Sequence, residues 1–208
     1  MRKRLFLALA AVAMVSAGCA SSASGLPTPA PGGDSSGTSS APTTEPSGSP
    51  SSTVEVPPRP RDISLDGLDP CTLFTEAQRT QLKATDVDSG ESGSDNFKGM
   101  KECVLEVDDQ ERFYDYTALA VTTEGVDAWL TGQRNVEAEL TDVQGFPAAQ
   151  FKFRGSDGEG CDVAVGVAEK QNLWIQVVPY SRGFEQDELC QMARQATEMA
   201  MTTLQTLK

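Results

Sequence analysis

Five cysteines and the absence of histidine limit the chemistry open to this 208-residue chain. Cys19 stands alone near the start, and Cys71, Cys103, Cys161 and Cys190 are spread over the later part. Without histidine, the usual general base, the Ser-His-Asp and Cys-His arrangements and every histidine metal site are excluded. The groups that remain for chemistry are thiols, carboxylates and aromatic rings.

Cys19 directly follows a segment with the three parts of a secretory signal. Basic residues at positions 2–4 precede an apolar run over residues 5–15, which is too short for a membrane span of about 20 residues. The sequence Ser16-Ala17-Gly18-Cys19 resembles the lipobox of bacterial lipoproteins, which more often has Leu in place of Ser16. The resemblance implies a signal peptide over residues 1–18 and an acylated Cys19. The alternative is a secreted protein with an incidental cysteine.

The segment after Cys19 has the composition of a disordered tether. Residues 20–62 contain nine of the twelve prolines, many Ser and Thr, and no aromatic residue. Such a chain buries too little apolar surface to offset its conformational entropy. As a flexible coil it would span roughly 35–40 Å, enough to hold a domain away from the membrane. We therefore predict a lipidated Cys and tether over residues 19–62 and one globular domain over residues 63–208.

The four remaining cysteines are predicted to form two disulfides, because the chain leaves the reducing cytosol. Four cysteines allow three pairings, and sequence alone does not choose among them. We favour Cys71–Cys103 and Cys161–Cys190, since each bridge then ties a strand start to a nearby helix in the same half of the chain. Zinc is the rival use of four cysteines, but no CxxC pair is present.

The domain is strongly acidic, and its charge bears on its partners. Residues 63–208 contain 26 Asp and Glu against 12 Lys and Arg, a formal net charge of −14. Such a surface repels nucleic acid rather than attracting it. Neither nucleotide-binding glycine motif occurs. We expect no cofactor, no metal, no nucleic acid and a monomer.

The carboxylates allow two further hypotheses, a glycosidase and a calcium site. A pair of them could act as the acid and base of a glycosidase, although nothing in the sequence marks two as buried. The stretch 155–162 is rich in Gly, Asp and Glu, which suggests a calcium site. It lacks the EF-hand spacing, so a glycine-rich hairpin tip is the better interpretation.

Hydrophobic spacing predicts an α+β domain. Thr75 and Gln78 have the spacing of a helix-capping box, and apolar residues at steps of three and four mark a long C-terminal helix. Residues 86–101 read as an exposed loop, and the hairpin that begins at Cys161 as a strand pair with one buried face. We expect a mainly antiparallel twisted sheet with helices packed on one face. The predicted helices cover residues 75–83, 125–133 and 189–207, and the predicted strands residues 103–107, 113–122, 139–143, 148–154, 161–168 and 173–178.

Aromatic residues are the best candidates for ligand recognition. Alternation places Trp174 on the sheet face opposite to Leu173 and Ile175, where a ligand or partner could stack. Tyr180, just after this predicted strand, is the second candidate. Ordinary packing of Trp174 under a loop or helix is the alternative.

The whole arrangement resembles a known family. The motifs are the Leu68-Asp69-Pro70-Cys71 stretch, Gly145-Phe146-Pro147-Ala148-Ala149, Cys161-Asp162-Val163-Ala164-Val165, and Cys103 and Cys190. They are similar to those of the actinobacterial lipoprotein family called domain of unknown function three-five-five-eight (DUF3558). The resemblance implies an envelope location and transfers no catalytic residue. A weaker likeness to the disulfide-containing sensor domains of actinobacterial membrane kinases suggests sensing by analogy only.

From these features we expect an envelope lipoprotein, anchored by lipid on the outer face of the cytoplasmic membrane. Its domain would act as a non-enzymatic binding, sensing or accessory module for an envelope protein or small ligand. The alternative is a carboxylate-dependent hydrolase acting on cell-wall polysaccharide, which would need two buried acidic side chains facing each other. A purely structural envelope component is the third reading.

Overall fold

The computed structural model describes residues 54–208, so Cys19, the predicted signal peptide and most of the predicted tether lie outside the described residues. The elements follow one another as a short 3-10 helix, a helix, three strands, a single-turn helix, four strands and a long helix. In chain order they are η1 (Pro70–Leu73), α1 (Glu76–Gln81), β1 (Asp86–Glu91), β2 (Lys101–Asp108), β3 (Phe113–Val121), α2 (Asp127–Leu130), β4 (Val136–Val143), β5 (Phe146–Phe153), β6 (Cys161–Ala168), β7 (Gln171–Pro179) and α3 (Gln186–Leu207).

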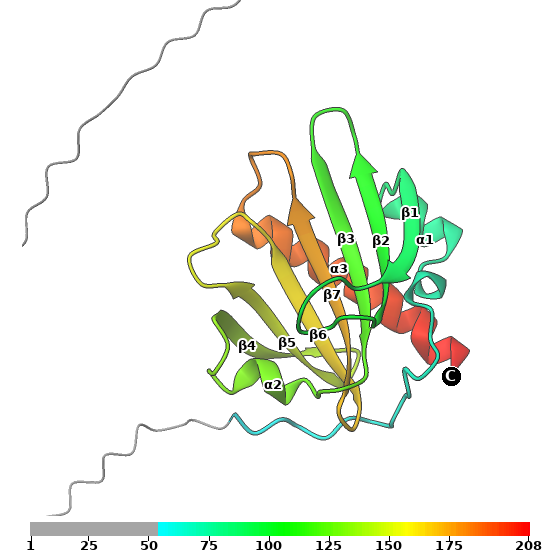
Figure 1. Cartoon of the computed structure of the whole chain (residues 1–208), viewed down its shortest axis with the longest axis vertical. Helices are drawn as coiled ribbons and strands as arrows, with labels where there is room; N and C mark the ends of the chain where they lie inside the picture. Colours follow the sequence, from blue (N-terminus) through cyan, green and yellow to red (C-terminus); the bar gives the residue numbers. More distant parts are fainter. Residues whose placement is uncertain (1–53) are drawn as a thin grey trace, which may run out of the picture. The chain divides into compact units, whose positions relative to one another are not determined.

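All seven strands form one sheet in the order β1-β2-β3-β7-β6-β5-β4, and every neighbouring pair is antiparallel. The long helix α3 crosses one face of this sheet (Figure 1). The predicted α+β class, with an antiparallel sheet and a long C-terminal helix, is confirmed.

Each face of the sheet has its own core. On the helix face, residues such as Leu105, Val163 and Ile175 pack with Leu189 and Ala193 of α3. On the opposite face, which we call the second face, a smaller cluster forms under α2 and the segment 92–100 (Figure 1). The expectation that the hairpin starting at Cys161 has one buried face is wrong, because β6 is buried on both faces except at its last residue.

The loop predicted over residues 86–101 is only partly correct, because β1 occupies its first six residues. This strand buries almost no side chain, with only Val87 partly covered, and it is held by its antiparallel pairing with β2. A hydrophobic pattern could not reveal it. The connection between β4 and β5 is short, since Gln144 and Gly145 alone join the two strands, with φ of 54° and 85°. Two positive φ values are typical of a tight hairpin turn.

Both favoured disulfides are present. Cys71–Cys103 links η1 to β2, and Cys161–Cys190 links the start of β6 to α3. The capping box is also confirmed, since the Gln78 N–H donates to Thr75 Oγ1 at 3.3 Å and the Thr75 N–H donates to Gln78 Oε1 at 2.8 Å.

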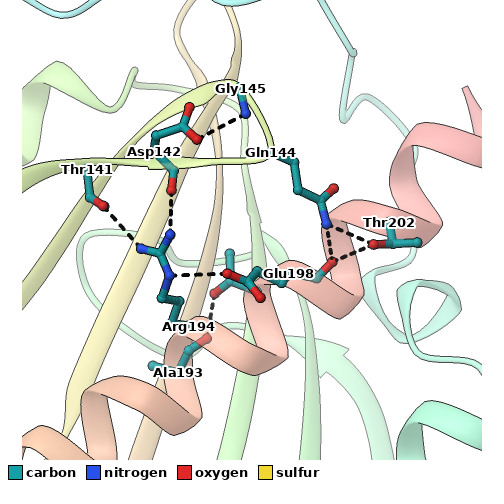
Figure 2. Close-up of polar contacts among 9 residues, drawn as sticks. Thr141, Asp142, Gln144, Gly145, Ala193, Arg194, Glu198 and Thr202 are labelled. Carbon is teal, nitrogen blue, oxygen red and sulfur yellow. Dashed lines mark hydrogen bonds and ion pairs between the residues drawn. The ribbon is translucent and has the colours of Figure 1, made fainter.

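Polar contacts fix α3 to the turn between β4 and β5 (Figure 2). Arg194 donates to Thr141 Oγ1 at 3.1 Å, to the Asp142 carbonyl at 2.9 Å and to Glu198 Oε1 at 3.1 Å. Gln144 Nε2 donates to the Glu198 carbonyl at 3.0 Å. These contacts join the main covering helix to the edge strand of the sheet.

Residues 54–62 have no regular structure but contact the domain. Val56 packs against the cluster on the second face, and Arg61 donates to the carbonyls of Gln205 and Lys208 at the end of α3. A guanidinium group at this position is favourable, because the carbonyl end of a helix carries partial negative charge. In residues 54–208, no helix is both long and apolar enough to cross a membrane.

Candidate functional site

Four aromatic side chains from separate parts of the chain meet on the second face. Phe97 comes from the connection between β1 and β2, Trp129 from α2, Phe151 from β5 and Trp174 from β7. Trp129 stacks on Phe151 with ring centroids 4.1 Å apart, and Trp174 lies 5.1 Å from Phe97 and 5.2 Å from Trp129. Trp129 and Phe151 are buried, whereas Trp174 remains partly exposed.

A buried carboxylate holds the Trp174 indole. Trp174 Nε1 donates to Asp162 Oδ1 at 2.8 Å. Asp162 lies on β6, one strand away, and is 1% exposed. Burial raises the pKa of Asp162 to about 7, and hydrogen bonds from Trp174 and Gln176 counteract part of this rise. Trp174 is therefore fixed both by packing and by a directed hydrogen bond.

Two hollows open beside Trp174, and together we call them the Trp174 site. The first, of about 420 Å³, is lined by Trp174 with Thr117, Gln176, Glu102 and others from β2 and β3. The second, of about 320 Å³, lies between the segment 92–100 and β4. Three residues border both hollows: Ser94, Phe153 and Trp174.

The groups around the Trp174 site combine apolar and polar surface. Aromatic and aliphatic surface from Trp174, Phe153 and Leu119 stands beside hydroxyl, amide and carboxylate groups. Concave sites with a few placed polar groups on an apolar lining are typical of ligand binding. Within residues 54–208, Asp162 is the one acidic residue that is buried.

The guanidinium group of Arg134, on the second face, makes structural contacts. Arg134 pairs with Glu124 at 2.5 Å, and its guanidinium carbon lies 4.0 Å above the Trp129 ring. These contacts fix the loop after α2 over the aromatic cluster, so Arg134 forms a wall of the smaller hollow.

Another hollow, of about 470 Å³, lies near Cys190 on the helix face. Part of its polar lining is already paired: Lys152 Nζ is 3.3 Å from Glu137 Oε2, and Gln150 Nε2 donates to Glu139 Oε1 at 3.0 Å. It contains neither a buried ionisable group nor an aromatic cluster comparable to that around Trp174. We therefore take the Trp174 site as the better candidate.

The structure separates the two aromatic residues predicted for recognition. Tyr180 follows β7 and is 68% exposed, six residues beyond Trp174 and thus about 20 Å along the strand. It lies next to Phe113, whose carbonyl accepts the Tyr180 N–H at 2.8 Å. Trp174 and Tyr180 share a sheet face but do not line one hollow.

Sequence reasoning did not identify Asp162 or Phe97 as part of the surroundings of Trp174. Asp162 alternates with Ala164 and Gly166 on the second face, so a charged residue among small ones was the available signal. Phe97 lies among Gly, Ser and Asp in the segment read as an exposed loop, where no periodicity marks it.

Comparison with known proteins gives a family and no further match. The model of the family described as "Protein of unknown function (DUF3558)" matches residues 14–203. Because this match covers most of the chain, the protein belongs to that family, as its motifs predicted. No curated protein and no solved structure matches.

Proposed function

We propose that this member of the DUF3558 family is a lipid-anchored envelope protein whose domain is a non-enzymatic binding module, with the Trp174 site as the centre of its binding surface. The anchor is supported by the leader and Cys19. An oxidising, extracytoplasmic setting is supported by the two disulfides. After loss of a signal peptide, acyl chains on Cys19 would hold the protein, since each buried methylene contributes about 0.8 kcal/mol.

The observation that carries the proposal is the fixed, partly exposed indole of Trp174. A surface tryptophan that can rotate loses entropy when it binds, whereas one already held in place loses little. The Asp162 carboxylate accepts a hydrogen bond from the Trp174 ring N–H, and Phe97 and Trp129 pack against the indole. Trp174 therefore offers a rigid apolar surface that a ligand ring or side chain can contact.

The hydrolase alternative receives no comparable support. Glycosidases place two carboxyl groups across the scissile bond, about 5 to 9.5 Å apart. Among residues 54–208, no second buried carboxylate accompanies Asp162. Glu102, on the rim of the larger hollow, is partly exposed. We therefore propose binding alone.

Photocrosslinking in living cells tests this proposal. Phe153, which borders both hollows and is 43% exposed, is replaced by p-benzoylphenylalanine. The control places the same group at Leu207, which is 52% exposed near the end of α3. We expect irradiation to give a discrete adduct from position 153 and none from position 207.

A second change ties the adduct to the indole. Trp174→Phe keeps an aromatic ring but removes the N–H that Asp162 accepts, so the adduct from position 153 should fall at least fivefold while the protein stays folded by circular dichroism. Identical crosslinking from positions 153 and 207, or an adduct unaffected by this substitution, would rule out the Trp174 site as the binding centre.

A further inference from the structure

The second face is uncovered over β1, β2, β3 and the end of β7, beyond the segment 92–100. Directly opposed residues on neighbouring strands share a face. Asp86 opposes Glu106, and Glu106 opposes Asp115, so three carboxylates form one row across three strands. Together with their neighbours on the same face they make what we call the acidic face, defined by six residues: Asp86, Asp88, Glu102, Glu106, Asp108 and Asp115.

The acidic face holds no basic residue. Within residues 54–208, none of its six carboxylates has a Lys or Arg at ion-pair distance. Acidic residues elsewhere do, as in the pairs Arg112–Glu188 at 2.7 Å and Arg194–Glu198 at 3.1 Å. Like charges directly opposed on neighbouring strands destabilise a sheet. This concentration of negative charge therefore lowers the stability of the sheet. Its presence is not explained by a contribution to folding.

Exposed aromatic residues border the acidic face. Phe113 and Tyr180 lie side by side and are 44% and 68% exposed. Tyr180 lies two residues after Val178, the strand partner of Asp115, and partial burial raises the pKa of the Asp115 carboxyl group. Carboxylates beside aromatic rings form the environment that Lys and Arg side chains favour, through ion pairing and cation–π contact.

The size of the acidic face indicates what can occupy it. Three strands spaced about 4.8 Å apart give a width of about 10 Å, and the six residue steps from Glu102 to Asp108 give a length of about 20 Å. One metal ion could not contact this area, and anionic polymers or a second copy of this acidic domain would be repelled. An extended peptide of about six residues has the matching length.

We propose that the acidic face binds an extended segment of another protein that is rich in Lys and Arg. This inference rests on the proposed binding function and specifies the chemistry of the partner. The basic side chains would pair with the row formed by Asp86, Glu106 and Asp115, and a guanidinium group would stack on Phe113 or Tyr180. The Trp174 site would take a side chain farther along the same segment.

The test uses the full chain in detergent and a fluorescent, acetylated and amidated peptide of four Arg-Thr repeats. Binding is measured by anisotropy at 50 and 200 mM NaCl. The variant Asp86→Asn/Glu106→Gln/Asp115→Asn removes the central row. Its control, Glu55→Gln/Glu159→Gln/Glu169→Gln, removes the same charge from exposed positions outside the acidic face.

We expect about tenfold weaker binding for the first variant and less than twofold for the control, because three exposed ion pairs are lost only in the first. Phe113→Ala/Tyr180→Ala should weaken binding about threefold without changing its salt dependence. Removing like charges relieves repulsion, so the first variant should fold. The single change Glu106→Gln should also weaken peptide binding, but by less than the triple change.

Equal losses in the two triple variants would overturn the inference, since net charge alone would then explain binding. Displacement of the peptide by spermine at equal charge concentration would overturn it too, because a small polyamine would suffice. Absence of peptide binding by the unchanged protein would also refute it. If crosslinking from position 153 still succeeded in that case, the proposed binding function would stand and only the basic partner would be wrong.

Discussion

Asp162→Asn tests whether ionisation of the buried Asp162 carboxyl group, which accepts the Trp174 N–H, lowers the stability of the folded protein. Burial raises the pKa of Asp162 from 3.8 to about 7. Between these values the folded protein binds a proton that the unfolded chain releases, so the stability of the protein falls as pH rises. A difference of about three pKa units corresponds to about 4 kcal/mol between the acid limit below pH 4 and the limit above pH 7.

The asparagine variant keeps an oxygen that can accept the Trp174 N–H but carries no charge at any pH. Its free energy of unfolding relative to wild type should therefore rise by about 3 kcal/mol between pH 5 and pH 8. Urea unfolding at both pH values, followed by circular dichroism, measures this difference. Glu169→Gln, on the exposed turn between β6 and β7, controls for loss of one surface charge.

A constant difference between the Asp162→Asn variant and wild type at pH 5 and pH 8 would refute this reasoning. It would mean that Asp162 ionises as readily in the folded as in the unfolded protein, and that the carboxylate is better solvated than its 1% exposure indicates. The hydrogen bond to Trp174 would then not be formed in a dry environment.

Two further predictions concern the scaffold. Replacing both Cys161 and Cys190 with Ala opens a loop of 29 residues and should lower the free energy of unfolding by about 3 to 4 kcal/mol, measured by denaturant titration; a loss below about 1 kcal/mol would contradict the bridge's stabilising role. Gly166→Ala places a methyl group 2.8 Å from Val126 Cγ1 and should cost about 1 to 3 kcal/mol, whereas Gly93→Ala meets no atom within 4 Å and should cost little in the same titration.

The sequence predicts those parts of the fold in which local chemistry and final structure agree. The capping box at Thr75 and Gln78 needs only neighbouring residues. The favoured cysteine pairs are correct because each bridge joins residues in the same half of the chain, 32 and 29 positions apart. The C-terminal helix shows its buried stripe in its own spacing.

What the sequence could not predict depends on contacts between distant parts of the chain. β1 is a strand because β2 offers it backbone hydrogen bonds, and its own side chains stay mostly exposed. The Trp174 site needs Phe97, Trp129 and Phe151 from three other segments. The row of Asp86, Glu106 and Asp115 exists only through strand register, which a single sequence does not fix.

Intact-mass analysis of the protein from its native membrane tests the central claim most directly. Our account predicts a mature chain beginning at Cys19 that carries a diacylglyceryl group, with the remaining four cysteines resistant to alkylation until reduced. An N-terminus at any other residue, or a Cys19 without lipid, would contradict the proposal of a lipid-anchored binding module in the envelope.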